Sequence, residues 1–451
     1  MEFNVKHRSW FAVSAVALLF AAMLSGDGYG QAPAVGVSGA AGSKLREAMS
    51  QQDPAQKLRL LREAEPLFSD AVSKYSVLYP NLIDAYIGVD DLGDAAKAVD
   101  DMAKAGVQGV TESDSRLHLA AAFMNKKQYD SAMQQLNSTV ALLKSADAKT
   151  APMSKIQQGL VTALAMQGEA FLEKESTEKA LAALHESEEL RKRRHLDPSA
   201  NTVRYIARCY AALGKRDDSL ESFGEAYSLA AHRVNAIQRH IDVAGQSAAG
   251  FTQELTEQQE LLTRIKEDAR PVYGSRDVQN PLAKFLDEKL DAFDKAEIAD
   301  AMSKAKMYRS APDFNLASVS GSKTGLSELR GKVVLLNFWD TTCKPCRAEY
   351  PHLQKIQDEF KDQGLSVLMI NLDEDTTKVR PFAEKYGFTA RVLLKDDTIQ
   401  RAYGIGAIPH TVIIDGSGII RFNEIGFTLD TPEVFRAEIT SLLPKVQRAD
   451  R

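Results

Sequence analysis

Two cysteines three residues apart are the residues of this sequence best suited to chemistry. They bound the segment Cys343-Lys344-Pro345-Cys346, and thiols at this spacing indicate redox or metal chemistry. The segment follows the apolar run 333–339 and opens a helical pattern. Unpaired N–H groups and the positive dipole end at a helix N-terminus stabilise a thiolate, and proline is tolerated there. We therefore expect Cys343 to attack a disulfide and Cys346 to resolve the mixed disulfide.

A proline directly before a strand pattern is the second chemical signal. The segment Ala407-Ile408-Pro409-His410-Thr411 leads into an apolar strand, and an ordinary proline there would interrupt a central ladder. We expect the Ile408–Pro409 bond to be cis and to pack against the dithiol. The backbone of Ile408 would then be free to pair with an extended substrate.

The segments around the dithiol should also form the substrate surface. Lys344 and His410 could tune the thiolate, although solvated side chains are the alternative for both. The expected substrate contacts are Trp339, Thr342, Lys344, Pro345 and Ile408.

Other uses of the cysteine pair fit less well. A zinc ion needs about four ligands, and only His352 and His410 could join the two cysteines. A c-type haem needs histidine directly after the second cysteine, where Arg347 stands. A peroxiredoxin would share the Ala-Pro-Asp-Phe opening, but its Pro-x-x-x-Thr-x-x-Cys motif is lacking here. We therefore expect no metal or cofactor, and the disulfide itself is the predicted redox group.

The elements around these motifs alternate between strand and helix. The pattern from residue 311 on is β-α-β followed by β-β-α, which predicts an α/β sandwich. The expected strands are 333–339, 365–371, 411–415 and 419–422, and the expected helices are 346–361, 378–386 and 432–443.

Residues 311–447 resemble the TlpA/ResA-type thiol–disulfide oxidoreductases of the thioredoxin superfamily. The resemblance rests on Ala311-Pro312-Asp313-Phe314, the strand into Cys-x-x-Cys, Glu349-Tyr350-Pro351, and Ile408-Pro409 with Asp415, over about 30% of the chain. It implies a thioredoxin-like fold, attack by Cys343, resolution by Cys346 and a cis Pro409. It also implies reduction of exported proteins such as apocytochromes c.

Three positions depart from that family. Thr342 stands where a tryptophan usually precedes the first cysteine, and Asp340 adds negative charge where a small residue is usual. Asn337 occupies the strand position where cytoplasmic thioredoxins carry a buried carboxylate, and an amide cannot transfer a proton. The resemblance implies that Glu349, one helix turn beyond Cys346, transfers the proton instead. A solvated surface glutamate is the alternative.

The region 44–270 has helical patterning and hardly a strand signal. An aromatic residue is followed after nine residues by a small one and then by two further apolar or small ones, at periods of 37, 48 and 39 residues. Such spacing is typical of stacked helical hairpins and resembles a degenerate tetratricopeptide repeat, with Gly168 at a position that this family favours. A plain helical bundle is the alternative. The four instances are Tyr86, Ala95, Val99, Met102; Phe123, Ala132, Leu136, Thr139; Phe171, Ala180, Leu184, Ser187; and Tyr210, Ser219, Phe223, Ala226.

The N-terminus has the pattern of an export signal. Lys6, His7 and Arg8 precede an apolar run at 10–24, and small residues follow. We expect a signal peptide over 1–30 and a flexible leader over 31–43. The domain organisation expected beyond it is a helical-repeat domain over 44–270, a linker with a helix over 271–308 and the thioredoxin-like domain over 309–447. An uncleaved membrane anchor is the alternative to a soluble exported protein.

Composition and charge narrow the function further. The net charge of −5 on 451 residues gives no support to nucleic-acid binding. Three cysteines are too few for a disulfide scaffold, and Cys209 lies in an alanine-rich helical stretch where a buried, inert residue is expected.

The resulting hypothesis is an exported protein-disulfide reductase that acts on disulfide-containing proteins. A membrane thiol–electron donor would re-reduce it, and a protein partner would bind the helical repeats. Two alternatives remain open: a helical-repeat adaptor of an envelope complex with a redox-sensing domain, and an oxidase that forms disulfides.

Overall fold

The computed structural model describes residue 37 and residues 39–106, 110–146, 152–194, 196–273 and 281–444. The predicted signal peptide lies outside these residues. The first helix of the described residues, α2, begins at Gly39, so part of the expected leader is helical. Among the described residues, no helix is both long and apolar enough to cross a membrane.

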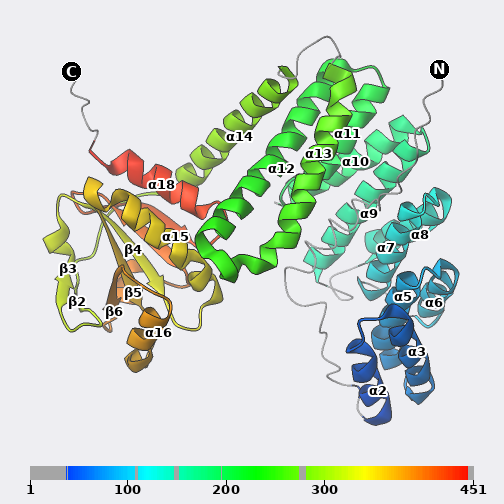
Figure 1. Cartoon of the computed structure of the whole chain (residues 1–451), viewed down its shortest axis with the longest axis horizontal. Coiled ribbons are helices and arrows are strands. Elements are labelled where there is room, and N and C mark those ends of the chain that lie inside the picture. Colours follow the sequence, from blue (N-terminus) through cyan, green and yellow to red (C-terminus); the bar gives the residue numbers. More distant parts are fainter. Residues whose placement is uncertain are drawn as a thin grey trace, which may run out of the picture. The chain divides into compact units, whose positions relative to one another are not determined.

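Helices account for the described chain as far as residue 305 (Figure 1). The all-helical nature of this region is as predicted. The helices are α2 Gly39–Met49, α3 Pro54–Ala64, α4 Ala71–Ser73, α5 Tyr79–Gly88, α6 Leu92–Lys104, α7 Val110–Asn125, α8 Tyr129–Ser145, α9 Met153–Glu173, α10 Thr177–Arg193, α11 Ala200–Ala212, α12 Arg216–Ala244, α13 Thr252–Tyr273 and α14 Pro281–Ala305.

The recurring small residues lie where successive helices meet. Ala95, Ala132, Ala180 and Ser219 are all fully buried. Small side chains let the backbones of neighbouring helices approach closely. At Gly168 in α9 the approach is extreme, because a Cβ there would lie 2.4 Å from Cγ of Leu184 in α10. The predicted helix contacts are therefore present, and the tetratricopeptide name stays a prediction.

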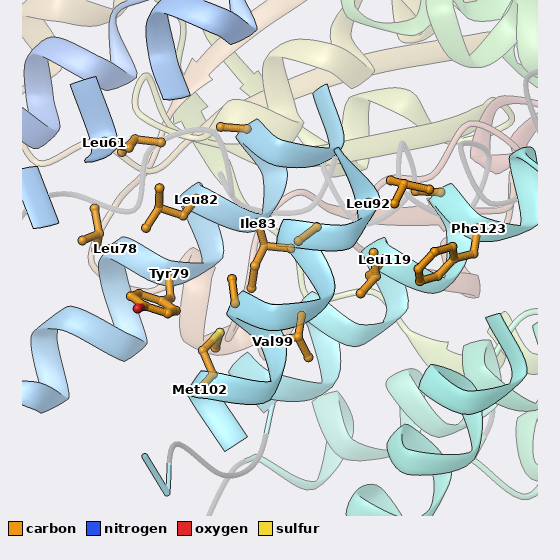
Figure 2. Packing of buried hydrophobic residues seen from close by; sticks show 14 of the residues in the cluster. Leu61, Leu78, Tyr79, Leu82, Ile83, Leu92, Val99, Met102, Leu119 and Phe123 are labelled. Atoms are coloured by element: carbon orange, nitrogen blue, oxygen red, sulfur yellow. The ribbon is translucent and has the colours of Figure 1, made fainter. Parts of the chain in front are cut away.

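The first helices share one apolar cluster. Figure 2 shows Leu82 and Ile83 of α5, Val99 of α6 and Leu119 of α7 among the side chains of this cluster. These side chains recur at helical spacing, so each helix presents one apolar stripe to its neighbours. The cluster stabilises the start of the helical region by removing this surface from water.

A six-stranded sheet carries the C-terminal part, in the order β1-β8-β7-β4-β5-β6. The β4–β5 and β5–β6 pairs are parallel, and the β1–β8, β8–β7 and β7–β4 pairs are antiparallel. A short β2–β3 hairpin forms a second, two-stranded sheet, and Ser318 directly after β2 bridges to Leu393 of β6. The strands are β1 Lys306–Ser310, β2 Asn315–Ala317, β3 Lys323–Gly325, β4 Val333–Trp339, β5 Leu365–Asn371, β6 Arg391–Leu394, β7 His410–Ile414 and β8 Ile419–Ile425; the helices are α15 Lys344–Phe360, α16 Val379–Lys385, α17 Ile399–Tyr403 and α18 Thr431–Leu442.

Helices cover both faces of this sheet, as the predicted sandwich requires. One apolar cluster joins the sheet to α15, α16 and α18, and a second joins the other face to α17. Each residue of β4 is buried, which explains its continuous apolar sequence. The thioredoxin-like α/β fold and the all-helical region are both as predicted.

The described residues group into two compact units. One contains the chain up to Ala230 together with Glu260–Leu286, and the other contains Ala231–Gln259 together with the chain from Asp287 on. This division cuts α12, α13 and α14. It differs from the boundaries at residues 270 and 309 that the sequence suggested. The second unit therefore holds the thioredoxin-like fold and also a helical segment from far upstream.

Candidate active site

The dithiol lies at the junction of the central strand and the first long helix of the sheet domain. Cys343 is the N-cap residue of α15, and its Sγ accepts a hydrogen bond of 3.2 Å from the backbone N of Cys346. The two cysteines form a disulfide with their Cα atoms 5.3 Å apart. Cys343 is half-buried, whereas Cys346 is 4% exposed. An incoming thiol or disulfide can therefore reach Cys343 more easily than Cys346.

Two carboxylates hold the loop before the helix. Asp340 Oδ1 accepts hydrogen bonds of 2.7 Å from the backbone N of both Thr342 and Cys343. Asp373, which follows β5, accepts bonds from the backbone N and the Oγ1 of Thr341 at 2.9 and 2.8 Å. Asp340 thus orders the turn that carries the attacking cysteine. Sequence reasoning missed Asp373, because a residue after another strand gives no local signal for this loop.

The proline loop lies beside the end of β4. The Ile408–Pro409 bond is cis, as predicted. His410 pairs with Phe338 in the β4–β7 register, which places Pro409 next to the strand end that leads to the dithiol. Ile408 is half-buried and packs against the same apolar cluster as Cys343. The Pro409 carbonyl accepts a hydrogen bond of 2.8 Å from the backbone N of Gly426.

Glu349 is a buried carboxyl group, not a surface one. It is 1% exposed, and its Oε2 accepts a hydrogen bond of 2.8 Å from Nδ2 of Asn337. The same amide donates to Oγ1 of Thr411 at 2.9 Å. Burial raises the pKa of Glu349 to about 8, and the hydrogen bond from Asn337 lowers it by less. A carboxyl group in this range can hold a proton at neutral pH and release it to a slightly stronger base.

Three of the expected substrate contacts lie on the surface of the loop. Thr342, Lys344 and Pro345 are exposed. Trp339 requires a correction, because it is 1% exposed and packs against the rings of Phe382 and Phe388 at 5.5 and 5.0 Å. Its large apolar ring fills the core beneath the site, so it cannot contact a substrate at the surface.

His410 also lies away from the sulfurs. His410 precedes Thr411 in β7, and Thr411 faces Asn337 and α15, so strand alternation puts His410 on the opposite face of the sheet. There its Nε2 lies 2.9 Å from Oδ1 of Asn423. The suggestion that His410 tunes the thiolate is therefore wrong. Within the described ranges, no three histidine, cysteine or acidic side chains gather as a metal site.

Cys209, the third cysteine, is fully buried in α11. Burial raises the pKa of its thiol to about 11. It is therefore an unreactive core residue, as predicted.

This fold and site define a thioredoxin-like protein with a disulfide-bonded cysteine pair at the start of α15. The AhpC/TSA family model matches residues 307–423. Thiol-disulfide oxidoreductase ResA of Geobacillus thermodenitrificans is 38% identical over 112 residues, which cover 25% of this chain and 64% of ResA. ResA of Halalkalibacterium halodurans is 36% identical over 133 residues, covering 29% of this chain and 76% of that protein.

A solved thiol:disulfide interchange protein of the thioredoxin family from Chlorobium tepidum is 25% identical. The match covers 31% of this chain and 98% of that one, with a TM-score of 0.29. Through its C-terminal part, the chain belongs to the ResA family of thiol-disulfide oxidoreductases.

Proposed function

We propose that this protein is an exported thiol–disulfide oxidoreductase that reduces disulfides of other proteins. One observation carries the proposal: the half-buried Cys343 caps α15, beside the cis Pro409 loop, and is bonded to a shielded partner cysteine. The helix N-terminus favours the thiolate of a cysteine at this position. ResA relatives bear the name thiol-disulfide oxidoreductase, which supports the same chemistry here.

The reaction transfers two electrons from the reduced cysteine pair to a substrate disulfide. The Cys343 thiolate attacks one substrate sulfur, the substrate S–S bond breaks, and the departing thiolate takes a proton from water. Cys346 then attacks Cys343 Sγ and releases the second substrate sulfur as a thiolate, which also takes a proton. The products are a substrate dithiol and the Cys343–Cys346 disulfide.

Glu349 would accept the proton of the buried Cys346 thiol and later donate it back. It lies one helix turn after Cys346 on α15, and both side chains are buried. When Cys346 attacks, the Glu349 carboxylate takes its thiol proton. When a donor thiol later reduces the disulfide at Cys343, protonated Glu349 returns a proton to the departing Cys346 thiolate. A pKa of about 8 lies close to that of an ordinary thiol, which suits transfer in both directions.

The substrate would bind across the exposed loop and the proline loop. Thr342, Lys344 and Pro345 present a surface around the attacking sulfur. The backbone of Ile408 would pair with an extended segment that carries the target cysteine. Main-chain pairing of this kind accepts many sequences, in keeping with exported protein substrates such as apocytochromes c.

Export rests on the N-terminal sequence, with its basic start and the apolar run at 10–24. An exported reductase has no access to cytoplasmic reductants, so a membrane thiol–electron donor would reduce the disulfide again. The helical unit would bind a protein partner.

The test is the reduction potential of the cysteine pair, measured by equilibration with dithiothreitol or glutathione buffers. A value near or below about −220 mV supports a reductase, and a value near about −120 mV would instead make the protein a disulfide donor. Cys346→Ser should accumulate a mixed disulfide with a model protein substrate, because the resolving thiol is missing. Cys343→Ser is the matched control and should trap none. If the wild type shows no reversible couple, the proposal fails and an adaptor role is left.

A further inference from the structure

A helical segment from far upstream belongs to the same compact unit as the dithiol. We call residues 231–259 the helical corner: it comprises the second half of α12, the 3₁₀ helix Gly245–Phe251 and the start of α13. The family match begins only at residue 307. No role for the helical corner therefore follows from the relatives.

His240 of the helical corner contacts the helix that carries the dithiol. It is 2% exposed, and its Nδ1 lies 2.8 Å from Nε2 of His352 in α15. The ring centroids are 5.1 Å apart and the ring planes are 15° from parallel, so the two rings meet edge to edge. Burial lowers the pKa of His352 to about 3 and also lowers that of His240. Both rings are therefore neutral near pH 7, and one donates its N–H to the other.

His240 also contacts the loop that joins β8 to α18. Its ring centroid lies 6.2 Å from that of Phe427, and His352 lies 5.7 Å from the same ring. One residue before Phe427, the backbone N of Gly426 donates to the carbonyl of Pro409. The His240 ring thus touches the dithiol helix directly and reaches the cis-proline loop through Phe427 and Gly426.

Further contacts hold the rest of this loop against the helical corner. Leu429 packs in an apolar cluster with Ala236 and Ile237. Asp430 lies 3.0 Å from Nε2 of His232 and 3.8 Å from Nη2 of Arg239. The loop is therefore held at one end by Pro409 and at the other by α12.

The chemistry needs two elements at a fixed separation. The attacking sulfur is on α15, whereas the backbone that would hold the substrate is on the proline loop. Different contacts fix the positions of these two elements. Reacting groups must lie within a fraction of an ångström of the productive geometry, and a displacement of about 1 Å can cost about a hundredfold in rate. A hydrogen bond between buried rings is directional, so the His240–His352 pair restricts α15 more tightly than apolar packing alone.

We propose that His240 is a positioning residue that sets the spacing between the dithiol helix and the cis-proline loop. The inference rests on the proposed disulfide exchange at Cys343. It makes the helical corner part of the active-site scaffold, so the functional redox unit of this chain extends upstream of the region shared with its relatives.

The experiment compares full-length variants in disulfide exchange with an oxidised protein substrate and with a small aromatic disulfide. His240→Phe keeps a buried ring and removes the hydrogen bond. We expect kcat/KM with the protein substrate to fall about tenfold or more, with a much smaller change for the small disulfide, which does not need the proline loop. Gln238→Ala, at an exposed position two residues away on α12, is the matched control and should leave both rates unchanged.

A second readout does not depend on activity. The amide of Gly426, bonded to the Pro409 carbonyl, should exchange its hydrogen faster in His240→Phe, while amides of the central strand β4 keep their protection. Equal protein-substrate rates and equal Gly426 exchange in wild type and His240→Phe would overturn the inference. If His240→Phe does not fold, Phe427→Leu is tested in the same two assays with the same expected results. An inactive wild type with faster Gly426 exchange in the variant would refute the proposed function and leave the positioning role intact.

Discussion

Replacing Glu349 with glutamine should make the thioredoxin-like fold more stable, by an amount that grows with pH. The pKa of Glu349 rises from its ordinary 4.5 to about 8 because the carboxyl group is buried. The folded protein therefore holds this proton more tightly than the unfolded chain does. Stability is lost as pH rises from 4.5 towards 8, where the unfolded chain has released the proton and the folded one still keeps it.

The size of the effect follows from these two values. One pKa unit corresponds to about 1.4 kcal/mol, so the carboxyl group costs about 1 kcal/mol at pH 5, about 3 kcal/mol at pH 7 and about 5 kcal/mol at pH 9. Glutamine is neutral at each pH and keeps an oxygen that can accept the hydrogen bond from Asn337 Nδ2. Glu349→Gln should therefore gain these amounts relative to the wild type.

The assay is denaturant unfolding of the oxidised proteins at the three pH values, followed by tryptophan fluorescence. Trp339 is buried in the core beneath the site and reports on this fold. Glu384→Gln removes an exposed carboxylate from α16 and serves as the control. The variant should unfold at higher denaturant than the wild type, and the gap should widen from pH 5 to pH 9. A gap that stays constant with pH would refute the reasoning, because it would mean that Glu349 is charged in both states.

Two further substitutions test contacts within each unit, one substitution in each. Gly168→Ala should destabilise the helical unit by about 1 to 3 kcal/mol in thermal unfolding, because the added methyl group would meet α10. Gly93→Ala is the control and should cost no stability, because a Cβ there meets only ordinary contacts. Equal losses of stability in the two variants would refute the close approach at Gly168. His232→Gln should lower stability below pH 6.5 by at most about 3 kcal/mol, because hydrogen bonds to Asp430 and Asp294 raise the pKa of His232 to about 9. This difference should disappear as pH rises through 9, and a difference independent of pH in denaturant unfolding would contradict the assignment.

The local sequence determined the elements and motifs that depend on neighbouring residues. The Cys343–Cys346 spacing, the cis Pro409 and the main strands and helices could all be predicted, because a helix start, a strand and a turn each leave a pattern within a few residues. Short edge elements such as β1, β6 and α17 were missed, since their patterns are too short to stand out. The helical character of residues 44–270 was also clear from spacing alone.

Only the tertiary structure decided what surrounds the cysteine pair. The burial of Glu349 depends on the sheet and on α15 together, so the sequence left a buried and a solvated glutamate equally open. The loop contact of Asp373 has the same origin. The pairing of His240 with His352 joins residues 112 positions apart. Such contacts are set by how whole elements pack, and packing over these separations leaves no periodic trace in the chain.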